Sequence, residues 1–453
     1  MSLELTDNRP RLLSRIHVRP AVRSSLWIVL LLAAALSLLA WYRAAPHGLV
    51  AGFTGSESYS TIARNWVERG RYSLAGDTPT AYRPPAYPAL LAACMWLFQD
   101  SWRLGALVIQ LGLGVACGLL VFALLTRVFQ DRLAGALGVV LYVTDICFQA
   151  EVTARRETVL FTALLLAFFY ILLSGATGTR RMVLLALFAG LAYLTRPVGA
   201  LLIAVFLFAL VLDSGGPRVS SRLRRVGIGI TVLIFTIAPW HVYVYHHFKT
   251  LTFAPTCTGG LNLYQGNNPA TDVIYPYVDV DLHSPEVHAL LIENGIPAED
   301  ELAVDTFLRA EAKRYIREHP LRFLRAGAVK ALALYSPVPV PLGTGQVRRR
   351  AGQVVLERFT PHLSKATFAF TFHGLLLLGG TLFFWATRRQ RGVCRNDRAV
   401  AYLMGFLVLV TLLHAVTFGE TRFRLPLDPL LILFAALAGA GWWRRRNTRA
   451  TVG

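Results

Sequence analysis

The chain alternates between long apolar runs and short polar segments. Apolar runs of the kind that cross a membrane occupy residues 27–42, 104–126, 133–149, 158–174, 182–195, 198–213, 226–245, 366–387, 399–417 and 425–443. A transmembrane helix requires about 20 mostly apolar residues. The pattern therefore predicts an all-α polytopic membrane protein with about ten transmembrane helices.

Basic residues indicate how these helices are oriented. Residues 1–26 form a basic arm, and residues 444–453 form a basic tail, so both termini are expected in the cytoplasm. The basic loops after residues 126, 174 and 213 also fall inside if residues 86–98 do not cross. We therefore expect 86–98 to be a helix that dips into the outer leaflet. One cluster, Arg348 to Arg350, is left outside by this arrangement.

The arrangement divides the chain into consecutive regions. They are the arm 1–26, a transmembrane catalytic module 27–245 with its first outer loop 43–103, a large outer loop 246–365, C-terminal helices 366–443 and the tail 444–453. Within the large loop, 302–325 has an amphipathic helical pattern but is too charged to cross. Residues 326–342 include Lys330 and are expected to form a half-inserted helix.

The first outer loop contains a short amphipathic helix. Tyr59, Ile62, Ala63 and Trp66 recur at the spacing of one helical face, with polar residues on the other faces. Gly70 is expected to end this helix, because glycine adopts a left-handed conformation easily. The pattern predicts a polar working surface laid against a membrane.

Composition supports a membrane protein. Hydrophobic residues are 55% of the chain and charged residues only 16%, whereas a soluble domain carries about 25% charge. The net charge of +20 would suggest nucleic-acid binding on one face of a soluble domain. Here the arginines lie in short clusters between apolar runs, which favours membrane lipids and no nucleic acid. The five cysteines include no CxxC pair, so neither a disulfide framework nor a thiolate metal site is expected.

Ionisable residues beside the outer ends of the apolar runs are the candidates for chemistry. They are Glu57, Glu157, Arg83, Arg196, Lys330, Arg422 and Arg424. Charged groups at a membrane boundary are costly and mark functional sites. A carboxylate can accept a proton from an acceptor hydroxyl, while cations hold the phosphate of a lipid-linked donor as it leaves.

Several motifs occur in the order found in one known group of enzymes. They are Tyr59–Trp66 (YSTIARNW), Arg83–Pro88 (RPPAYP), Arg156–Leu160, Leu194–Pro197, Gly259–Pro269 (GGLNLYQGNNP), His319–Leu324 and Arg422–Pro426 (RFRLP). With these motifs the chain resembles the GT-C glycosyltransferases. The resemblance is to the bacterial branch related to protein O-mannosyltransferases and the aminoarabinose transferase of lipid A, of the family 39/83 type.

The resemblance implies a GT-C-like helical bundle in the inner membrane, with outer juxtamembrane helices and an active site on the outer side. It implies an inverting transfer of sugar from a polyprenyl-phosphate donor to a glycan, lipid or protein acceptor. It also implies that Glu157 lies near the acceptor or the sugar. Glu57 and Glu157 are the expected catalytic residues, Glu57 as the acid nearest to Tyr59 in place of the aspartate of the family. The substrate-binding residues that the resemblance implies are Tyr59, Arg83, Tyr87, Arg196, Asn267, Asn268, Lys330, Arg422 and Arg424, with the arginines 83, 422 and 424 at the lipid phosphate. No cofactor or metal ligand is assigned, and a divalent metal stays possible.

The role of Glu57 has a structural alternative. The family has an aspartate three or four residues before the tyrosine matching Tyr59, where this chain has Gly55 and Ser56. Glu57 is therefore either the general base or the N3 member of a capping box with Thr54, and Asp77 is a further acid to consider.

Helix ends and turns offer structural explanations for several more of these residues. Glu157 could cap a helix, Arg196 could simply end one, and Arg422 and Arg424 could be interfacial arginines. The glycine-rich run from residue 259 could cradle phosphate or form ordinary turns.

A second class of function stays open. Lipid-linked glycan polymerases, ligases, flippases and transporters are also polytopic. Transporters commonly contain internal repeats, and none is evident here. The histidines at 241, 246 and 247 do not share a helical face, so they are expected to pack at the interface and not to bind metal. Because charged residues gather at the outer surface, the sequence favours a transferase.

Overall fold

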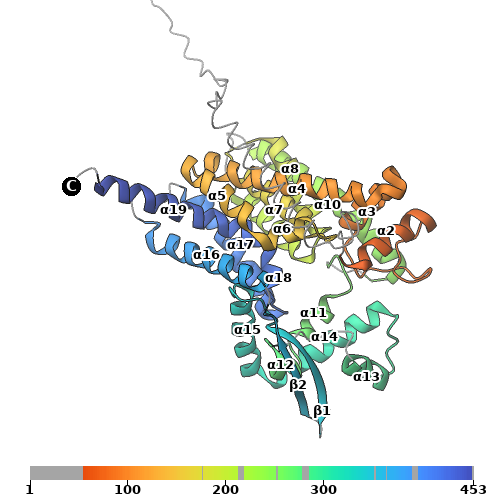
Figure 1. Cartoon of the computed structure of the whole chain (residues 1–453). Coiled ribbons are helices and arrows are strands. Elements are labelled where there is room, and N and C mark those ends of the chain that lie inside the picture. Colours follow the sequence, from red (N-terminus) through yellow and green to blue (C-terminus); the bar gives the residue numbers. More distant parts are fainter. Residues whose placement is uncertain are drawn as a thin grey trace, which may run out of the picture.

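The computed structural model describes residues 55–175, 177–212, 219–250, 254–277, 285–350, 353–363, 365–389 and 396–450. The basic arm 1–26 and the expected first span 27–42 lie outside these residues. The described chain is predominantly helical and contains one two-stranded sheet. Figure 1 shows a bundle of long helices with a smaller region of short helices and a β-hairpin beside it.

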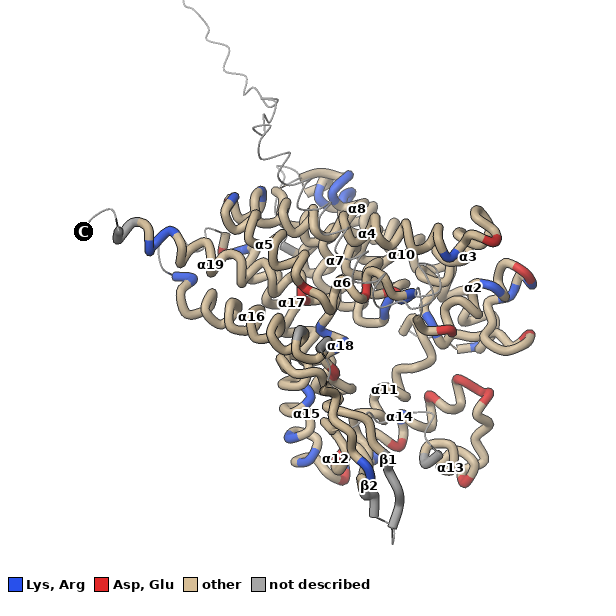
Figure 2. The backbone as a smooth tube through the Cα atoms, viewed as in Figure 1, with Lys and Arg blue, Asp and Glu red and all other residues tan. Residues whose placement is uncertain are grey.

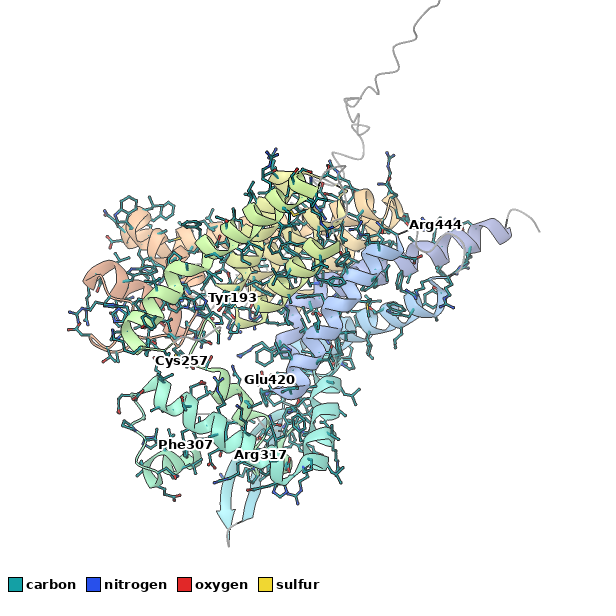
Figure 3. The ribbon with its side chains drawn as sticks, turned by 180° about the vertical axis from the view of Figure 1, so that it is seen from behind. Tyr193, Cys257, Phe307, Arg317, Glu420 and Arg444 are labelled. Atoms are coloured by element: carbon teal, nitrogen blue, oxygen red, sulfur yellow. The ribbon has the colours of Figure 1, made fainter. Side chains whose placement is uncertain are left out.

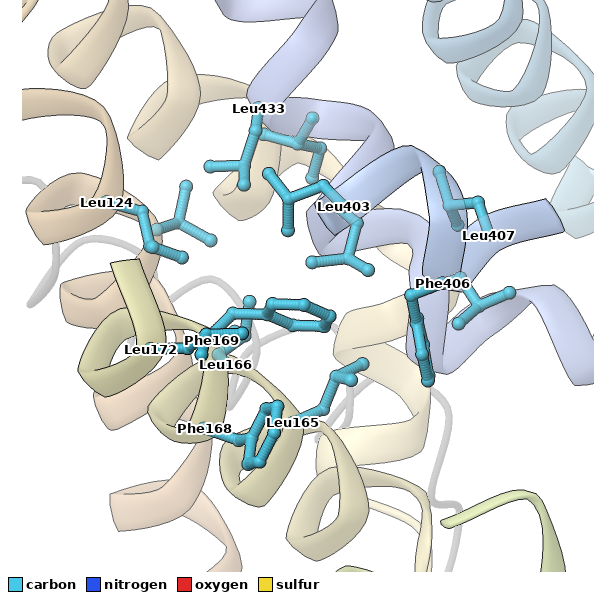
Figure 4. Packing of buried hydrophobic residues seen from close by; sticks show 14 of the residues in the cluster. Leu124, Leu165, Leu166, Phe168, Phe169, Leu172, Leu403, Phe406, Leu407 and Leu433 are labelled. Carbon is cyan, nitrogen blue, oxygen red and sulfur yellow. The ribbon is translucent and has the colours of Figure 1, made fainter. Parts of the chain in front are cut away.

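The bundle contains the apolar helices expected from the sequence. Its members are α4 (Trp102–Ala123), α5 (Arg132–Thr144), α6 (Ile146–Val152), α7 (Thr158–Leu173), α8 (Thr179–Tyr193), α9 (Ala200–Leu212), α10 (Val219–Phe248), α16 (Lys365–Thr387), α17 (Asp397–Val416) and α19 (Asp428–Ala450). Helix α7 is central, because Phe168 and Phe169 are fully buried and Phe169 packs against Phe406 of α17 (Figure 4).

The count of ten spans is not confirmed. Among the described residues, five helices are long and apolar enough to cross a membrane, or six if one bent pair counts as a span. Helices α7, α8 and α9 have 16, 15 and 13 residues. At 1.5 Å per residue, even α7 is only about 24 Å long, which is less than the roughly 30 Å of a hydrocarbon core.

The helices are interrupted at two places that the hydropathy pattern did not locate. The expected span 133–149 bends by 67° between α5 and α6. Asp145 lies at this bend and its carboxylate accepts a hydrogen bond from the backbone N–H of Phe148, which starts a new helix there. Residues 86–98 form their own helix, α3 (Ala86–Phe98), which ends where Gln99 adopts a φ of 44°.

The loop before residue 103 forms the expected short helix, α2 (Glu57–Arg69), and Gly70 ends it in a left-handed conformation. Tyr59, Ile62 and Ala63 are buried as expected. The polar side of α2 is less exposed to solvent than the sequence pattern suggests. Asn65 is buried, because its amide donates a hydrogen bond to the carbonyl of Ser73 and so holds the chain that follows the helix.

The large loop folds into several short elements. They are α11 (Gly259–Gln265), α12 (Thr271–Ile274), α13 (Pro285–Glu293), α14 (Glu301–Glu318), α15 (Pro320–Leu334), β1 (Gly343–Arg350) and β2 (Gln353–Pro361). The predicted helices 302–325 and 326–342 have the wrong boundary. The break falls at Pro320, because proline suits the first position of a new helix, and residues 335–342 are not helical. The antiparallel hairpin, which includes Arg348 to Arg350, was not expected.

Charged residues are unevenly distributed over these regions. Figure 2 shows basic residues at the C-terminal end of α19 and acidic residues along the α13–α14 segment. Arg444 of α19 forms an ion pair of 2.6 Å with Asp131, which caps the start of α5. This pair ties the C-terminal part of α19 to the start of α5.

Candidate functional site

A cavity of about 400 Å³ lies where the bundle meets the first loop and the large loop. Its lining residues come from segments far apart in the sequence. They are Tyr59, Tyr82, Arg83, Pro84, Glu157, Thr195, Arg196, Pro197, Thr256, Thr258, Leu261, Asn262, Gln265, Glu420, Arg422 and Phe423. In Figure 3, Glu420 lies where the C-terminal helices meet the loop region. We call this space the polar cavity, since five of its lining residues are arginines or glutamates.

Glu157 and Arg196 form the ion pair at its centre. Glu157 stands between α6 and α7, and Arg196 between α8 and α9, so both lie in turns at the same end of packed helices. Oε1 of Glu157 is 3.3 Å from Nε of Arg196, and the two side chains are 14% and 12% exposed. Glu157 makes no side-chain capping bond to α7, and Arg196 has an extended backbone. Neither Glu157 nor Arg196 therefore serves only to cap or to end a helix.

The surroundings keep Glu157 ionised. Burial by itself would raise the pKa of this carboxyl group, but the Arg196 guanidinium, then Arg83 and a hydrogen bond from Tyr59 outweigh it. The net effect is a pKa below the ordinary value for glutamate. At neutral pH the polar cavity therefore contains a carboxylate anion beside guanidinium cations.

Arg83 is held in place by aromatic and hydroxyl groups. Its guanidinium lies 4.9 Å from the ring centre of Tyr59 and 4.7 Å from that of Tyr82. Its Nε donates a 3.1 Å hydrogen bond to the hydroxyl of Ser58. The hydroxyl of Tyr72 donates a 2.8 Å hydrogen bond to the Arg83 carbonyl, which fixes the backbone. Burial, followed by the nearby Glu157 charge, raises the pKa of Tyr59, so this hydroxyl stays protonated.

Tyr87 supports the site from behind and does not line the cavity. It is fully buried, and its hydroxyl hydrogen-bonds to Oε1 of Gln110. The amide of Gln110 donates in turn to the carbonyls of Val152 and Ala154, at 3.2 and 2.6 Å. This buried chain of hydrogen bonds positions the segment that leads to Glu157.

Glu57 lies beside the polar cavity but does not line it. It is the first residue of α2 after the N-cap Ser56, so the capping box with Glu57 at the N3 position is wrong. Its carboxylate pairs with Arg155, whose side chain is 4% exposed while that of Glu57 is 77% exposed. A β-bridge between Gly55 and Arg155 brings these two segments together.

The two arginines near the C-terminus have separate environments. Both belong to α18 (Thr421–Arg424). Arg422 lines the polar cavity. Arg424 is buried away from it, where its side chain donates to Asp428 at 2.8 Å and to the Ser336 carbonyl at 2.7 Å. The structure therefore brings only one member of this pair to the cavity.

Asn267, Asn268 and Lys330 connect elements outside the polar cavity. The Lys330 ammonium group is fully buried and donates to the carbonyls of Gly266 and Thr417, at 3.1 and 3.0 Å. The Asn267 amide donates to the Val416 carbonyl at 2.9 Å, and Asn268 accepts hydrogen bonds from the N–H groups of the following turn. These contacts join the large loop to the end of α17.

The first N–H groups of the glycine-rich run do not form a phosphate cradle, although Leu261, Asn262 and Gln265 of the run line the polar cavity. Residues 259–265 are helix α11, and Asp305 accepts hydrogen bonds from the N–H groups of Gly260 and Leu261. The N–H groups that could have bound an anion are therefore occupied by a carboxylate. A Cβ atom on Gly260 would lie 1.9 Å from the Asp305 carbonyl oxygen, so glycine here permits close packing on α14.

Sequence reasoning missed Glu420 as a site residue. It is 6% exposed and lines the polar cavity as the N-cap of α18. The available signal was an acidic residue two positions before Arg422 in a short turn between apolar runs. Asp77, the further acid considered, pairs with Arg71 at 3.2 Å and does not line this cavity. Within the described part of the chain, no cluster of three or more His, Cys, Asp or Glu side chains could hold a metal ion.

Known proteins resemble the chain in sequence and in fold. Residues 82–243 match the family model described as dolichyl-phosphate-mannose-protein mannosyltransferase. No curated protein matches the chain significantly. The structure of archaeal oligosaccharyltransferase AglB from Archaeoglobus fulgidus, in complex with an inhibitory peptide and a dolichol-phosphate, is similar with a TM-score of 0.53 and 14% identity. The match covers 95% of this chain and 52% of that chain, so this chain spans about half the length of AglB.

Two structures of ArnT from Cupriavidus metallidurans also match, each with a TM-score of 0.37. The apo structure is 14% identical and the match covers 92% of this chain and 78% of that one. The structure bound to undecaprenyl phosphate is 15% identical, with 93% and 78% covered. The likeness to AglB shows that the chain has the GT-C fold, and residues 82–243 match the mannosyltransferase family model.

Proposed function

We propose that the protein transfers a sugar from a polyprenyl-phosphate donor to an acceptor hydroxyl at the outer face of the inner membrane. The observation that carries the proposal is the polar cavity. It collects Arg83, Arg196 and Arg422 with Glu157 and Glu420 from distant parts of the chain. The match of residues 82–243 to a family of mannosyltransferases supports the same class of reaction.

The arginines suit a phosphate leaving group. As the glycosidic bond breaks, negative charge grows on the lipid phosphate, and positioned guanidinium groups stabilise that charge. Arg83 is fixed by Tyr59, Tyr82 and Ser58, so it is pre-organised for this role. Arg422 is exposed, which allows its guanidinium to close on a bound phosphate. The long lipid chain of the donor would remain in the bilayer.

The chemical step is a single displacement. The acceptor oxygen forms a bond to the anomeric carbon while the bond from that carbon to the phosphate oxygen breaks. The electron pair leaves with the polyprenyl phosphate, and the acceptor proton passes to a carboxylate. Attack opposite the leaving group inverts the anomeric centre.

We propose separate roles for the carboxylates of Glu57 and Glu157. Glu57 also pairs with an arginine, Arg155, but its side chain is 77% exposed, whereas that of Glu157 is 14% exposed. The sequence neighbours of Glu57, Ser56 and Ser58, line the space next to Arg83, so an arriving acceptor can reach Glu57. It is proposed as the general base. Glu157 is committed to Arg196 and has a lowered pKa, which makes it a weak base. We assign it to holding Arg196 and a sugar hydroxyl in place.

Sugar transfer from defined donors tests this function. Purified protein in proteoliposomes would be supplied with labelled sugars on polyprenyl phosphate, and release and transfer of the label would be measured. Wild type should turn over at least one donor, and Arg196→Gln should lose most of that turnover. Arg71→Gln is a matched control, because Arg71 is an exposed arginine of the same loop region, paired with Asp77 away from the polar cavity. Absence of turnover and of polyprenyl-phosphate binding in wild type would favour a polymerase, ligase, flippase or transporter.

A further inference from the structure

A second cavity of about 600 Å³ adjoins the polar cavity. Four residues, Tyr82, Arg83, Thr258 and Leu261, line both spaces. The two cavities therefore adjoin at these residues, and Arg83 borders both. We call the second space the apolar arm.

The apolar arm has more aliphatic lining residues than the polar cavity. The apolar arm is lined by the aliphatic side chains of Leu74, Leu261, Val287, Leu291, Ala298 and Val304. The hydroxyl of Ser58 accepts a hydrogen bond from Arg83, so this polar group lies on the side that faces Arg83. The polar lining residues are Ser56, Ser58, Tyr82, Arg83, Thr258, His288 and Glu301. A ligand in this arm would thus place an apolar body among aliphatic groups and a hydroxyl near the junction.

The walls of the apolar arm are fixed by hydrogen bonds. Oε2 of Glu301, the first residue of α14, accepts a 2.8 Å hydrogen bond from the N–H of Ala81. Oε1 accepts one from the hydroxyl of Thr80. These bonds attach the start of α14 to the segment two residues before Arg83, so the arm is formed before any ligand arrives.

We propose that the apolar arm is the acceptor subsite and that it takes an acceptor whose reacting hydroxyl is joined to an apolar body. This proposal rests on the proposed function. The donor phosphate occupies the polar cavity in that function, and the acceptor has to reach the same junction from another side. The apolar arm provides that approach, and burying an apolar body there removes it from water.

The donor lipid is a poorer occupant of this arm. All the lining residues belong to the first loop and the large loop, and none belongs to a helix that could span the membrane among the described residues. A polyprenyl chain is most stable in the bilayer beside the spanning helices. The apolar arm therefore suits a shorter apolar group carried by the acceptor.

Two acceptor probes with the same hydroxyl groups test the proposal. Octyl glucoside, kept below its micelle concentration, and methyl glucoside would be compared by their effect on sugar release from a donor that wild type hydrolyses. The octyl probe should accelerate release at least about tenfold more than the methyl probe, because several methylene groups become buried. Ala298→Trp should remove this difference, since Ala298 is exposed and lines the arm, where an indole would fill the space.

Ala310→Trp is the matched control. Ala310 is also exposed, on α14, and lines neither cavity. It should keep the preference for the octyl probe, donor hydrolysis and polyprenyl-phosphate binding, and Ala298→Trp should keep polyprenyl-phosphate binding. Equal effects of the two probes, no acceleration by either, or an unchanged preference in Ala298→Trp would overturn the proposal. Loss of polyprenyl-phosphate binding in Ala298→Trp alone would overturn it too, by placing the donor lipid in the arm. If wild type releases sugar from no donor, with or without an acceptor, the proposed function itself fails and this inference falls with it.

Discussion

The Glu157 carboxylate lies 3.3 Å from Nε of Arg196, although the two residues are separated in sequence by helices α7 and α8. These helices pack against each other, and the chain turns between them. The turn brings the start of α7 and the end of α8 to the same level of the bundle. A local helical hairpin therefore creates the central ion pair of the polar cavity.

The pH dependence of the protein's stability should reflect this pair. Because the pKa of Glu157 is lowered, its carboxylate stabilises the folded protein above the ordinary glutamate pKa of about 4.3. That contribution is lost only as pH falls through the lower, folded-state value. In Arg196→Gln the strongest opposing cation is gone, so burial should raise the pKa of Glu157. The acid limb of the thermal-stability profile should then move to higher pH, and a limb that stays in place would contradict the assignment.

Substitution of Arg422 and Arg424 should have different consequences. Arg422→Ala should fold normally and weaken donor use by roughly 2–5 kcal/mol in transition-state terms, as for one lost charge partner. Arg424→Ala should leave Asp428 buried without its cation, at a cost of about 3–5 kcal/mol in folding stability. Kinetics with a defined donor and thermal unfolding in detergent distinguish the two effects. Equal losses of stability would show that Arg422 is structural as well.

Glu57→Gln tests the general base. A neutral amide cannot take the acceptor proton, so the variant should lose about 10²- to 10⁴-fold in rate while remaining folded. The measurement is transfer of a labelled sugar at matched protein amounts. Wild-type activity in this variant would move the base elsewhere, with Glu157→Gln and Glu420→Gln as the next comparison.

Gly55 should be intolerant of a side chain. A Cβ atom there would lie 2.2 Å from the carbonyl oxygen of Arg155, so Gly55→Ala must separate the bridged segments that carry Glu57 and Arg155. We expect reduced activity and reduced thermal stability. Gly112→Ala is the control, because a Cβ atom added to Gly112 on α4 would meet no neighbouring side chain or loop within 4 Å. It should be neutral or slightly stabilising, and equal behaviour of the two variants would refute the close-contact explanation.

Membrane topology gives a further prediction. Ser56, Thr258 and Gly419 lie in or next to the lining of the two cavities and should face outward. Gly178 and Asn396 adjoin the basic clusters and should face the cytoplasm. Single cysteines at these positions can be labelled on intact cells with an impermeant reagent. Labelling at the first three positions alone is expected, and labelling of Gly178→Cys would reverse the orientation.

Much of the fold followed from the pattern of apolar residues. The helices near 158–174, 366–387 and 399–417 match α7, α16 and α17 to within two residues. Sequence also indicated Glu157, Arg83 and Arg196, which the structure brings to one cavity. These residues were identifiable because ionisable groups stand out at the ends of apolar runs.

The features that the sequence did not predict depend on contacts in the folded chain, which local sequence patterns do not reveal. The bend at Asp145 arises from a capping bond within an apolar run. Lys330 and Arg424 were expected to bind substrate, yet each donates a hydrogen bond in the interior to a backbone carbonyl more than 80 residues away in sequence. Glu420 was missed because nothing local distinguishes a buried acid from an exposed one.

The most direct test of the central claim is donor turnover by the Arg196→Gln variant beside wild type. Both would be reconstituted at equal amounts and supplied with a polyprenyl-phosphate sugar, with Arg71→Gln as the control. We predict that wild type and the control release labelled sugar at similar rates and that Arg196→Gln releases it at least about 10²-fold more slowly, as when one charge partner worth about 3 kcal/mol is lost. Equal release by all three proteins would contradict the account, since the ion pair of Glu157 and Arg196 would then take no part in the reaction.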